Sequence, residues 1–408
     1  MTRNEMLRRY GPWISLVIAA AAYFPRFAKD PVGMVVYPQA GDCIVHGEPL
    51  RQCAELFSYP PVFGFLMAPF ALMPMGARVA LWYVISIAAS AGCFVISERL
   101  VMSLLPGRWS ERDLAWLRVV TLLLSLKFVL AVLEYQAYDT LAFVIVLAGL
   151  WAVLLERDWS GGALLALAAA IKATPLVFLP YLIVKRRFVA AGVFAVVFLG
   201  LWLLPDAYAA LEGARPHYLQ EWLGQIAGPA LADRQTAASF WPTWMGANVL
   251  NHSFHGTVAR LVVGTPAARH ATLILYSLCA VYVAAIGLLL LRSSRRDDFV
   301  AVDGSILLIA MLMLSPMTSR YHYILLMLPY MTVAGIAIRD ASLRMPAIVT
   351  LLVSFVLGTA TSNDIAGHRL TDWSYAHNFL VFSALALQAF LAFVIVRNDV
   401  RQTSAAPA

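Results

Sequence analysis

Charged residues are scarce in this chain. Only 13% of its 408 residues are Asp, Glu, Lys or Arg, whereas a soluble domain has about a quarter. This scarcity excludes an ordinary water-soluble globular fold. Apolar residues make up 61% of the chain, and many apolar runs reach the roughly 20 residues that a helix needs to cross a bilayer. The composition therefore predicts an all-α, polytopic integral membrane protein.

Other features are also missing from the sequence. It has no Gly-rich phosphate loop in a strand–helix context and no soluble domain to house one, which argues against nucleotide binding. It has no clear internal repeat, which weakens a transporter built from duplicated halves. His252 and His255 lack partners at a zinc-like spacing, so we expect no required metal and no other cofactor.

The apolar runs predict about ten full transmembrane helices, with juxtamembrane helices in the outer loops. The first run is expected to be a retained anchor, because no small-residue cleavage site follows it. The expected spans lie near residues 10–27, 79–102, 115–133, 139–156, 188–205, 270–292, 301–316, 323–338, 345–360 and 378–397.

One apolar segment is broken in the middle. The stretch GGALLALAAAIKATPLVFLPYLIVKRR has two apolar halves joined at Lys172–Pro175. Each half rises only about 17 Å as a helix, too little for a comfortable crossing. We expect a hairpin or a pair of short helices, which a membrane tolerates only against protein or a watery cavity.

The distribution of basic residues predicts the orientation. With the N-terminus inside, the cytoplasmic loops hold 18 of the 30 Lys and Arg residues, and the longer outer loops hold ten. The net charge of +7 is thus explained by the positive-inside rule rather than by nucleic-acid binding. We expect one transmembrane domain over 1–408, with both termini cytoplasmic, extracytoplasmic loops at 28–78, 206–269, 315–322 and 361–377, and a flexible cytoplasmic tail at 398–408.

The first outer loop is polar and contains two cysteines. Cys43 and Cys53 form a disulfide if the compartment is oxidising, and are free thiols otherwise. Asp30 precedes Pro31, which suits a helix N-cap or a general base at the membrane face. Asp42 is either a solvated loop charge or a second candidate base.

Charged groups near the ends of other spans suggest an anion site. Lys172 has no acidic neighbour in sequence and would match a phosphate, unless it snorkels to the interface. Arg320 and His322 suit a lipid phosphate or diphosphate, or belong to an interfacial belt. Glu134 and Asp139 are membrane-edge carboxylates, which are functional candidates because such charges are costly.

The loop FWPTWMGANVLNHSFHGTVAR combines aromatic, amide and imidazole side chains. Such groups form the walls of sugar sites, offering apolar stacking and hydroxyl partners; an interfacial aromatic belt is the alternative. The residues concerned are Trp241, Trp244, Asn248, Asn251, His252, His255 and Arg260.

Taken in order, these pieces resemble glycosyltransferase family 87, polyprenol-phosphate-sugar-dependent transferases of the GT-C membrane class. The matching stretches are GEPL and FSYPPVFGFLMAPFALMP in the first loop, EYQAYD, AAAIKATPLVFLPYLIVKRRF, NHSFHGTVAR and LSPMTSRYHYILLMLP. The Lys-x-Thr-Pro and Ser-Pro…His stretches are the more specific ones. In the family the catalytic Asp lies four residues before a juxtamembrane Tyr; counting back from Tyr37 gives Gly33.

The resemblance implies an inverting sugar transfer from a polyprenyl-phosphate donor to a lipid or glycan acceptor, with mannose as the family's usual sugar. Asp30, or else Asp42, would be the base, and Lys172, Arg320 and His322 would meet the donor phosphate. Sugar or acceptor would be held by Tyr37, Tyr59, Gln136, Asp139, Trp241, Trp244, Asn251, His252 and Arg260.

The resemblance also implies a place in the cell, a bacterial inner membrane with the site on its outer face among membrane lipids. Two other classes of function stay open at this point. A transporter or flippase of a lipid-linked sugar would use the same cavity without a base. A non-enzymatic membrane scaffold predicts that deletion of the protein causes no loss of any glycolipid.

Overall fold

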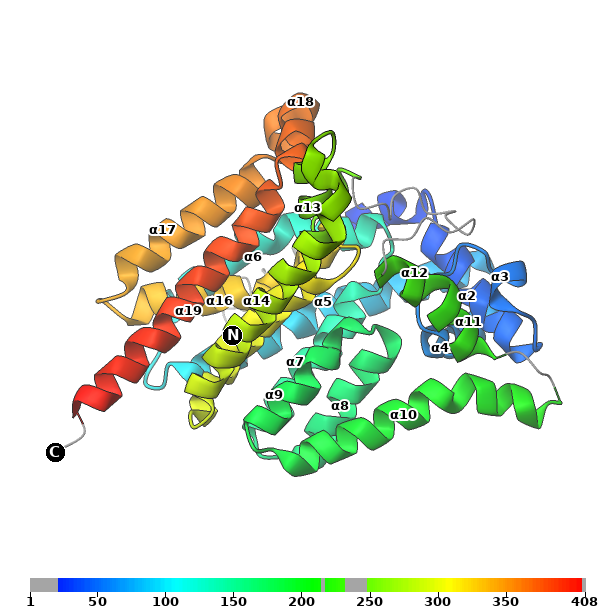
Figure 1. Ribbon diagram of the computed structural model, residues 1–408, viewed down its shortest axis with the longest axis horizontal. Helices are drawn as coiled ribbons and strands as arrows, with labels where there is room; N and C mark the ends of the chain where they lie inside the picture. Colours follow the sequence, from blue (N-terminus) through cyan, green and yellow to red (C-terminus); the bar gives the residue numbers. More distant parts are fainter. Residues whose placement is uncertain (1–20, 214–216, 232–247, 406–408) are drawn as a thin grey trace, which may run out of the picture.

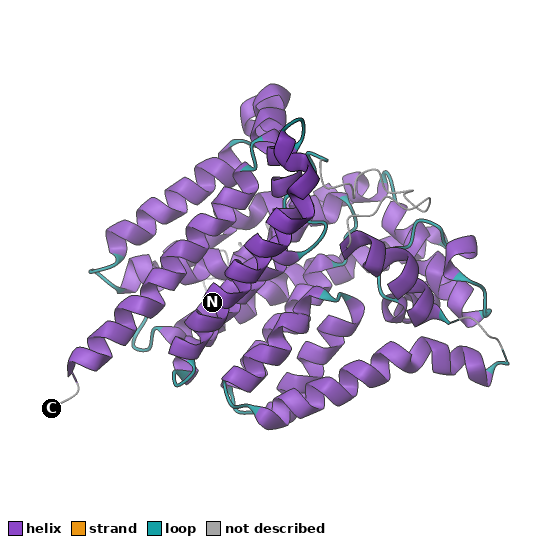
Figure 2. Ribbon diagram, viewed as in Figure 1, coloured by secondary structure: helices purple, strands orange, loops and turns teal. Residues whose placement is uncertain are grey.

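Helices form all the regular structure of residues 21–213, 217–231 and 248–405, the part of the chain that the computed structural model describes (Figures 1 and 2). No strand occurs within these ranges. The prediction of an all-α polytopic membrane protein is confirmed, because several of these helices are long and apolar.

The chain forms the following elements, where η marks a 3₁₀- or π-helix. Residues 21–28 are also helical. The labelled elements are α2 (Val32–Val45), α3 (Leu50–Cys53), α4 (Pro61–Ala71), α5 (Met75–Leu104), α6 (Glu111–Glu134), α7 (Asp139–Leu154), α8 (Asp158–Ile171), η1 (Thr174–Val177), α9 (Phe178–Val184), α10 (Phe188–Leu211), α11 (Tyr218–Trp222), η2 (Leu223–Ala227), α12 (Gly228–Leu231), α13 (Phe254–Val262), η4 (Pro266–His270), α14 (Ala271–Ser293), η5 (Asp297–Phe299), α15 (Val300–Leu314), η6 (Arg320–Leu326), α16 (Met327–Arg339), α17 (Arg344–Phe355), η7 (Val356–Ala360), α18 (Asn363–Ala376) and α19 (Phe379–Ala405).

The expected number of spans is not confirmed. Among the described residues, six helical stretches are long and apolar enough to cross a membrane, or seven if the bent pair Arg344–Ala360 and Ile365–Ala376 is one span. The expected spans at 139–156 and 301–316 are α7 and α15, of 16 and 15 residues. At 1.5 Å per residue they fall short of a bilayer core of about 30 Å. The expected span at 10–27 lies mostly outside the described residues.

Two of the most deeply buried helices are α15 and α16, and they form the core. Every residue of α15 except Leu314 is buried, so this helix touches protein on all sides. It packs on α16 and α19, while α16 also contacts α5, α6 and α17. A helix that is apolar all round is expected in such a core.

Small residues allow the second group of helices to pack closely. In Figure 1, α7, α8 and α9 lie beside the long α10, while α2, α3, α4, α11 and α12 gather near its far end. A Cβ on Gly162 of α8 would lie 2.3 Å from the backbone oxygen of Ala190 in α10, and one on Gly41 of α2 would lie 2.4 Å from the backbone nitrogen of Ala68 in α4. Glycine is therefore needed at both contacts.

The broken segment is confirmed as a pair of short helices. α8 ends at Ile171, Lys172 has an extended backbone, and η1 and α9 then continue the chain. Pro175 lies near the start of η1, where its missing N–H costs no helical hydrogen bond. The break places the Lys172 side chain at a junction between helices instead of in the middle of one.

The loops predicted to be cytoplasmic meet at one end of the bundle. The Lys185 amine donates to the backbone oxygens of Ser293 and Arg296, at 2.7 and 3.0 Å. Arg339 donates to the Arg108 oxygen at 3.0 Å, and Arg397 to the Ser342 oxygen at 3.4 Å. These contacts join the predicted cytoplasmic loops to one another in pairs, and their orientation across a membrane stays a prediction.

Candidate functional site

A cavity of about 540 Å³ opens among helices from distant parts of the chain. Its volume is typical of small-molecule sites. Most of the wall is apolar or aromatic, and the polar side chains are few. The wall is formed by residues in the ranges 58–60, 135–138, 172–176, 222–230 and 315–322, together with Trp202, Leu250, His252 and Tyr375.

Lys172 reaches the cavity wall with a carboxylate beside it. Its amine donates to Asp139 Oδ1 at 2.7 Å and lies 5.2 Å from the centre of the Tyr138 ring. Asp139 is the first residue of α7, where the helix dipole favours a negative charge. The sequence showed no acidic neighbour for Lys172, but the fold supplies one from 33 residues away.

His322 completes this cluster. Its Nδ1 lies 2.7 Å from the backbone nitrogen of Ser319 and accepts that N–H, which assigns the ring proton to Nε2. Nε2 lies 3.6 Å from Asp139 Oδ1. The second oxygen of Asp139 is buried and has no hydrogen-bond partner among the described residues. One carboxylate thus fixes both the lysine and the imidazole at the wall.

Arg320 lines the same cavity and is held by two neighbouring side chains. Its guanidinium donates to Glu134 Oε2 at 2.7 Å and to the Tyr135 hydroxyl at 3.3 Å. Glu134 ends α6 and also accepts a hydrogen bond from Arg26 at 3.2 Å. Three of the predicted groups, Lys172, Arg320 and His322, therefore line one cavity.

Several buried polar atoms of the wall have no hydrogen-bond partner among the described residues. Buried polar groups in folded proteins are nearly always hydrogen-bonded, so these atoms are exceptions that cluster around the cavity. The atoms are Thr174 Oγ1, Trp202 Nε1, Arg320 Nε and both ring nitrogens of His252.

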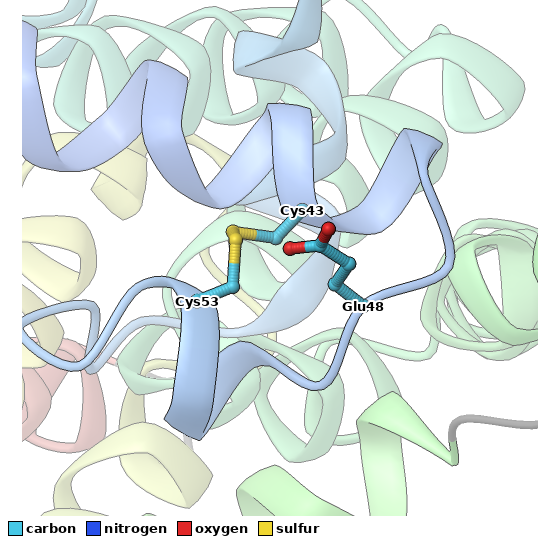
Figure 3. Close-up of side chains that lie close together, drawn as sticks. All are labelled: Cys43, Glu48 and Cys53. Carbon is cyan, nitrogen blue, oxygen red and sulfur yellow. A yellow bond between two sulfur atoms is a disulfide. The ribbon is translucent and has the colours of Figure 1, made fainter.

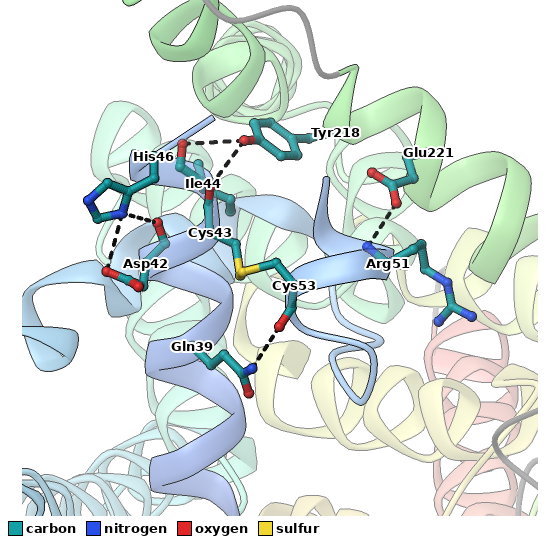
Figure 4. Close-up of a disulfide and its surroundings, with 9 residues drawn as sticks. All are labelled: Gln39, Asp42, Cys43, Ile44, His46, Arg51, Cys53, Tyr218 and Glu221. Atoms are coloured by element: carbon teal, nitrogen blue, oxygen red, sulfur yellow. Dashed lines mark hydrogen bonds and ion pairs between the residues drawn. A yellow bond between two sulfur atoms is a disulfide. The ribbon is translucent and has the colours of Figure 1, made fainter. Parts of the chain in front are cut away.

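The predicted bases lie away from this wall. Asp30 is exposed before α2, and it does not cap that helix, because the N-cap is Pro31 and no side chain caps it. Asp42 is exposed and pairs with His46, with 3.4 Å between its Oδ1 and the His46 Nδ1 (Figure 4). No carboxylate of the described residues lines the cavity. Asp30 and Asp42 therefore stay predictions.

Gly33, at the place where the family resemblance expects the acid, is closely packed. A Cβ on Gly33 would lie 3.0 Å from both the Cβ and the backbone oxygen of Gln136. The Gln136 side chain is buried and joins two segments, donating to the Phe27 oxygen at 2.8 Å and accepting the Met34 N–H at 3.3 Å. Gln136 is thus engaged within the protein and does not line the cavity.

Tyr37 and Tyr59 belong to one aromatic cluster. Their ring centres lie 5.6 Å apart, and the Tyr59 ring lies 4.8 Å from the Tyr138 ring. Tyr59 lines the cavity, whereas Tyr37 is buried behind it. Tyr37 therefore supports the wall.

The amide and arginine of the predicted sugar loop stabilise the protein itself. Asn251 donates to the Pro316 oxygen at 2.9 Å and accepts from the Ser253 hydroxyl at 2.8 Å. Arg260 donates to the Asn248 oxygen at 2.6 Å and to the Asn378 side chain. Neither residue lines the cavity, and Trp241 and Trp244 lie outside the described residues.

His252 is the member of this loop that was predicted for the site and does line the cavity. Burial, together with the positive charges of Arg260, Lys127 and Arg320, lowers the pKa of His252 to about 3. Its imidazole is therefore neutral at physiological pH, and one ring nitrogen keeps a free lone pair while the other carries a proton.

A disulfide joins Cys43 and Cys53, with 6.0 Å between their Cα atoms (Figure 3). Glu48 lies beside it. Because the two sulfurs are bonded to each other, they are not thiolates and cannot bind a metal as such. The loop they close is attached to α11, since the Arg51 N–H donates to Glu221 Oε1 at 2.9 Å (Figure 4).

Sequence reasoning missed several aromatic members of the wall. Trp202 lies within the span α10 and packs on Trp222 of α11, with ring centres 5.8 Å apart. Tyr375 ends α18 and its ring lies 4.6 Å from that of His252. Trp202 falls in the expected span 188–205 and Tyr375 in the expected outer loop 361–377, where an interfacial aromatic belt is an equally good explanation.

The fold and the cavity define a class: a helical integral membrane protein whose polar groups meet an apolar cavity among its helices. The chain belongs to glycosyltransferase family 87, whose family model matches residues 57–316.

Two curated relatives are named polyprenol-phosphate-mannose-dependent alpha-(1-2)-phosphatidylinositol pentamannoside mannosyltransferase. That of Mycobacterium tuberculosis (strain CDC 1551 / Oshkosh) is 30% identical over 281 residues, 66% of this chain and 56% of the relative. That of Mycolicibacterium smegmatis (strain ATCC 700084 / mc(2)155) is 33% identical over 205 residues, 48% of this chain and 45% of the relative. The chain thus spans about half the length of these relatives. No solved structure matches it.

Proposed function

We propose that this protein is a membrane glycosyltransferase that moves a mannosyl group from a polyprenyl-phosphate donor to a hydroxyl of a lipid or glycan acceptor. The observation that carries the proposal is the cavity wall, where Lys172, Arg320 and His322 stand in a mostly apolar lining. A lipid-linked sugar has the same two parts, an apolar tail and a polar head. Family membership and the printed names of the two relatives support this choice of donor.

The transfer would be an inverting displacement. The acceptor oxygen attacks the anomeric carbon, the bond from that carbon to the phosphate oxygen breaks, and the electron pair leaves with the lipid phosphate. Lys172, Arg320 and His322 would stabilise the charge that develops on that phosphate. Asp139 holds Lys172 and faces His322, so it would position both donors without touching the sugar.

The remaining assignments follow from the same scheme. Asp30 and Asp42 are the candidate bases for the acceptor hydroxyl, Tyr59 and His252 would contact the sugar, and Trp241 and Trp244 keep their proposed sugar-binding role. The donor phosphate needs no nucleotide site, and we propose that no metal or other cofactor is required. We place the site on the outer face of a bacterial inner membrane, among membrane lipids.

A transfer assay tests the function directly. Purified protein in lipid nanodiscs would be given polyprenyl-phosphate mannose with a radiolabelled sugar and a glycolipid extract as acceptor. We expect labelled glycolipid to form with wild-type protein, and to fall about 10²–10³-fold in Lys172→Gln, because a phosphate-stabilising charge is lost. Labelled donor that is carried across sealed vesicles but never consumed would contradict a transferase and indicate a flippase.

A double variant tests the assignment of the base. Asp30→Asn with Asp42→Asn removes both candidate carboxylates, and both side chains are exposed, so the protein should still fold. We expect transfer to fall about 10²–10⁴-fold, the usual contribution of a general base. Full transfer by the double variant would remove both residues from the mechanism while leaving the transferase assignment intact.

A further inference from the structure

Tyr135 places an open aromatic ring on the wall of the cavity. It is the C-cap residue of α6, and it is 51% exposed, the largest exposed fraction among the aromatic residues of the described wall. Tyr138, three residues further on, also lines the cavity but is only 2% exposed. Protein therefore covers the Tyr138 ring, whereas much of the Tyr135 ring is left for a ligand to contact.

Two neighbours hold the Tyr135 ring in one orientation. Arg320 donates to its hydroxyl at 3.3 Å, and the guanidinium carbon lies 5.1 Å from the ring centre. The ring of Tyr321, which also lines the cavity, has its centre 5.4 Å away, and the two planes are inclined by 40°. Tyrosine has few rotatable bonds, so a ring held in this way offers contact area at a low cost in conformational entropy. The surface is thus formed before a ligand binds.

The two tyrosine rings adjoin the groups that would bind the donor phosphate. Tyr135 contacts Arg320 directly, and the ring centre of Tyr321 lies 4.4 Å from that of His322. In a sugar carried on a lipid phosphate, one oxygen joins the phosphorus to the sugar ring. A sugar whose phosphate is bound by Arg320 and His322 must therefore lie close to these tyrosines.

An interfacial aromatic belt is the other explanation for an exposed tyrosine. A belt residue directs its ring at lipid, whereas Tyr135 lines a cavity and its hydroxyl accepts a hydrogen bond from an arginine of the same wall. Tyr276 of α14 provides a comparison, because it is 49% exposed but does not line this cavity. The two tyrosines are thus almost equally exposed and differ in whether they line the cavity.

We propose that Tyr135, supported by Tyr321, is the surface on which the sugar ring of the donor stacks while Arg320 binds the adjoining phosphate. Sugar rings present patches of C–H groups, and the flat apolar face of an aromatic ring matches such a patch. The Tyr135 hydroxyl stays with Arg320, so the ring contributes stacking and the hydroxyl contributes orientation. This assignment rests on the proposed function, which supplies the sugar-bearing donor.

Binding of two lipids, one with the sugar and one without it, tests the assignment. Native mass spectrometry of the purified full chain would be titrated with polyprenyl-phosphate mannose and, separately, with polyprenyl phosphate. We expect Tyr135→Ala to weaken binding of the sugar-bearing lipid about 3–10-fold, the size of one stacking contact. Binding of polyprenyl phosphate should stay within about twofold of wild type, since that lipid has no ring to stack.

Two variants serve as matched controls. Tyr135→Phe keeps the ring and loses only the hydroxyl, so it should retain the wild-type ratio of the two affinities. Tyr276→Ala removes an equally exposed tyrosine away from this cavity and should change neither affinity. In the transfer assay, Tyr135→Ala should raise the KM for the donor by the same factor as the loss of binding, with a much smaller change in kcat.

Three results would overturn the assignment. Equal weakening of both lipids in Tyr135→Ala would mean that Tyr135 acts only through Arg320. Unchanged binding of both lipids would make it a belt residue, and a Tyr135→Phe that behaves like Tyr135→Ala would exclude stacking. The proposed function fails differently: wild type would then bind neither lipid and transfer no sugar, and the assignment of Tyr135 would fall with it.

Discussion

Among the described residues, two Lys–Asp pairs have the same 2.7 Å separation, and the other contacts of each pair differ. Lys185–Asp303 lies at the end with the basic loops. There Lys185 also donates to two backbone oxygens, and the other oxygen of Asp303 accepts the Ser293 hydroxyl at 2.7 Å. Lys172–Asp139 lies at the cavity, and the second Asp139 oxygen has no hydrogen-bond partner in the part of the chain that the structure describes.

The difference teaches how to tell a structural pair from a functional one. A buried ion pair stabilises only when its remaining hydrogen-bonding groups are satisfied. In Lys185–Asp303 each carboxylate oxygen has a contact, Lys185 at Oδ2 and the Ser293 hydroxyl at Oδ1, and the pair joins the α9–α10 turn to α14 and α15. In Lys172–Asp139 one Asp139 oxygen has no partner among the described residues, and the lysine lines the cavity, where a ligand can reach it.

The largest effect is expected from breaking the saturated pair. Lys185→Gln leaves the Asp303 charge buried without its cation, which should lower the free energy of unfolding by about 3–5 kcal/mol. Thermal unfolding in detergent measures this, and transfer per folded molecule should stay at the wild-type value. Replacing both partners, as Lys185→Met with Asp303→Leu, should recover most of the stability. Equal stability of wild type and Lys185→Gln would remove the distinction between the pairs.

The pair at the cavity should respond in the opposite way. Lys172→Gln should reduce transfer about 10²–10³-fold, equivalent to about 2.7–4 kcal/mol of transition-state stabilisation. The melting temperature should change less than in Lys185→Gln, because Lys172 is partly exposed to the cavity, at 14%. Transfer rate and melting temperature, measured on one preparation, show whether Lys172 acts in catalysis or in stability. A melting temperature that drops as far as that of Lys185→Gln, with normal kcat, would make both pairs structural.

The third prediction concerns His252, a buried group whose ring nitrogens have no hydrogen-bond partner among the described residues. Its pKa is lowered from 6.5 to about 3, so below pH 6.5 the unfolded chain binds a proton that the folded protein does not. Stability is therefore lost as pH falls from 6.5 toward 3, by about 2 kcal/mol at pH 5. Melting curves at pH 7.5 and pH 5 should show a smaller difference in His252→Gln than in wild type.

An exposed histidine provides the control for that measurement. His270→Gln removes a histidine that is exposed at the start of α14 and serves as the matched control. If His252→Gln and His270→Gln behave alike, His252 titrates normally and is not sealed in the wall.

The smallest effect is expected at the second oxygen of Asp303. Ser293→Ala removes the hydroxyl that it accepts, and one hydrogen bond to a charged group is worth about 1.5–3 kcal/mol, less where water can replace it. Because Ser293 is buried, we expect about 1.5 kcal/mol from denaturant unfolding. No loss would mean that Asp303 is satisfied by Lys185 alone.

The sequence was informative where chemistry is local. Charge scarcity predicted a helical membrane protein, and the Lys-Ala-Thr-Pro stretch predicted the break that places Lys172. The sequence could not show that Asp139 pairs with Lys172, because the contact joins the start of α7 to the end of α8, 33 residues further along the chain. Nor could it show that Gln136 is used internally, since that depends on the approach of Gly33.

The disulfide between Cys43 and Cys53 can also report the compartment in which the first loop folded. Such bonds form outside the cytoplasm and are rare within it. If the two cysteines resist alkylation in intact cells and react only after reduction, the disulfide was present in the cell, and the loop was therefore exported before the bond formed. The same pair of cysteines can therefore map the orientation of the whole chain without any tag or added residue.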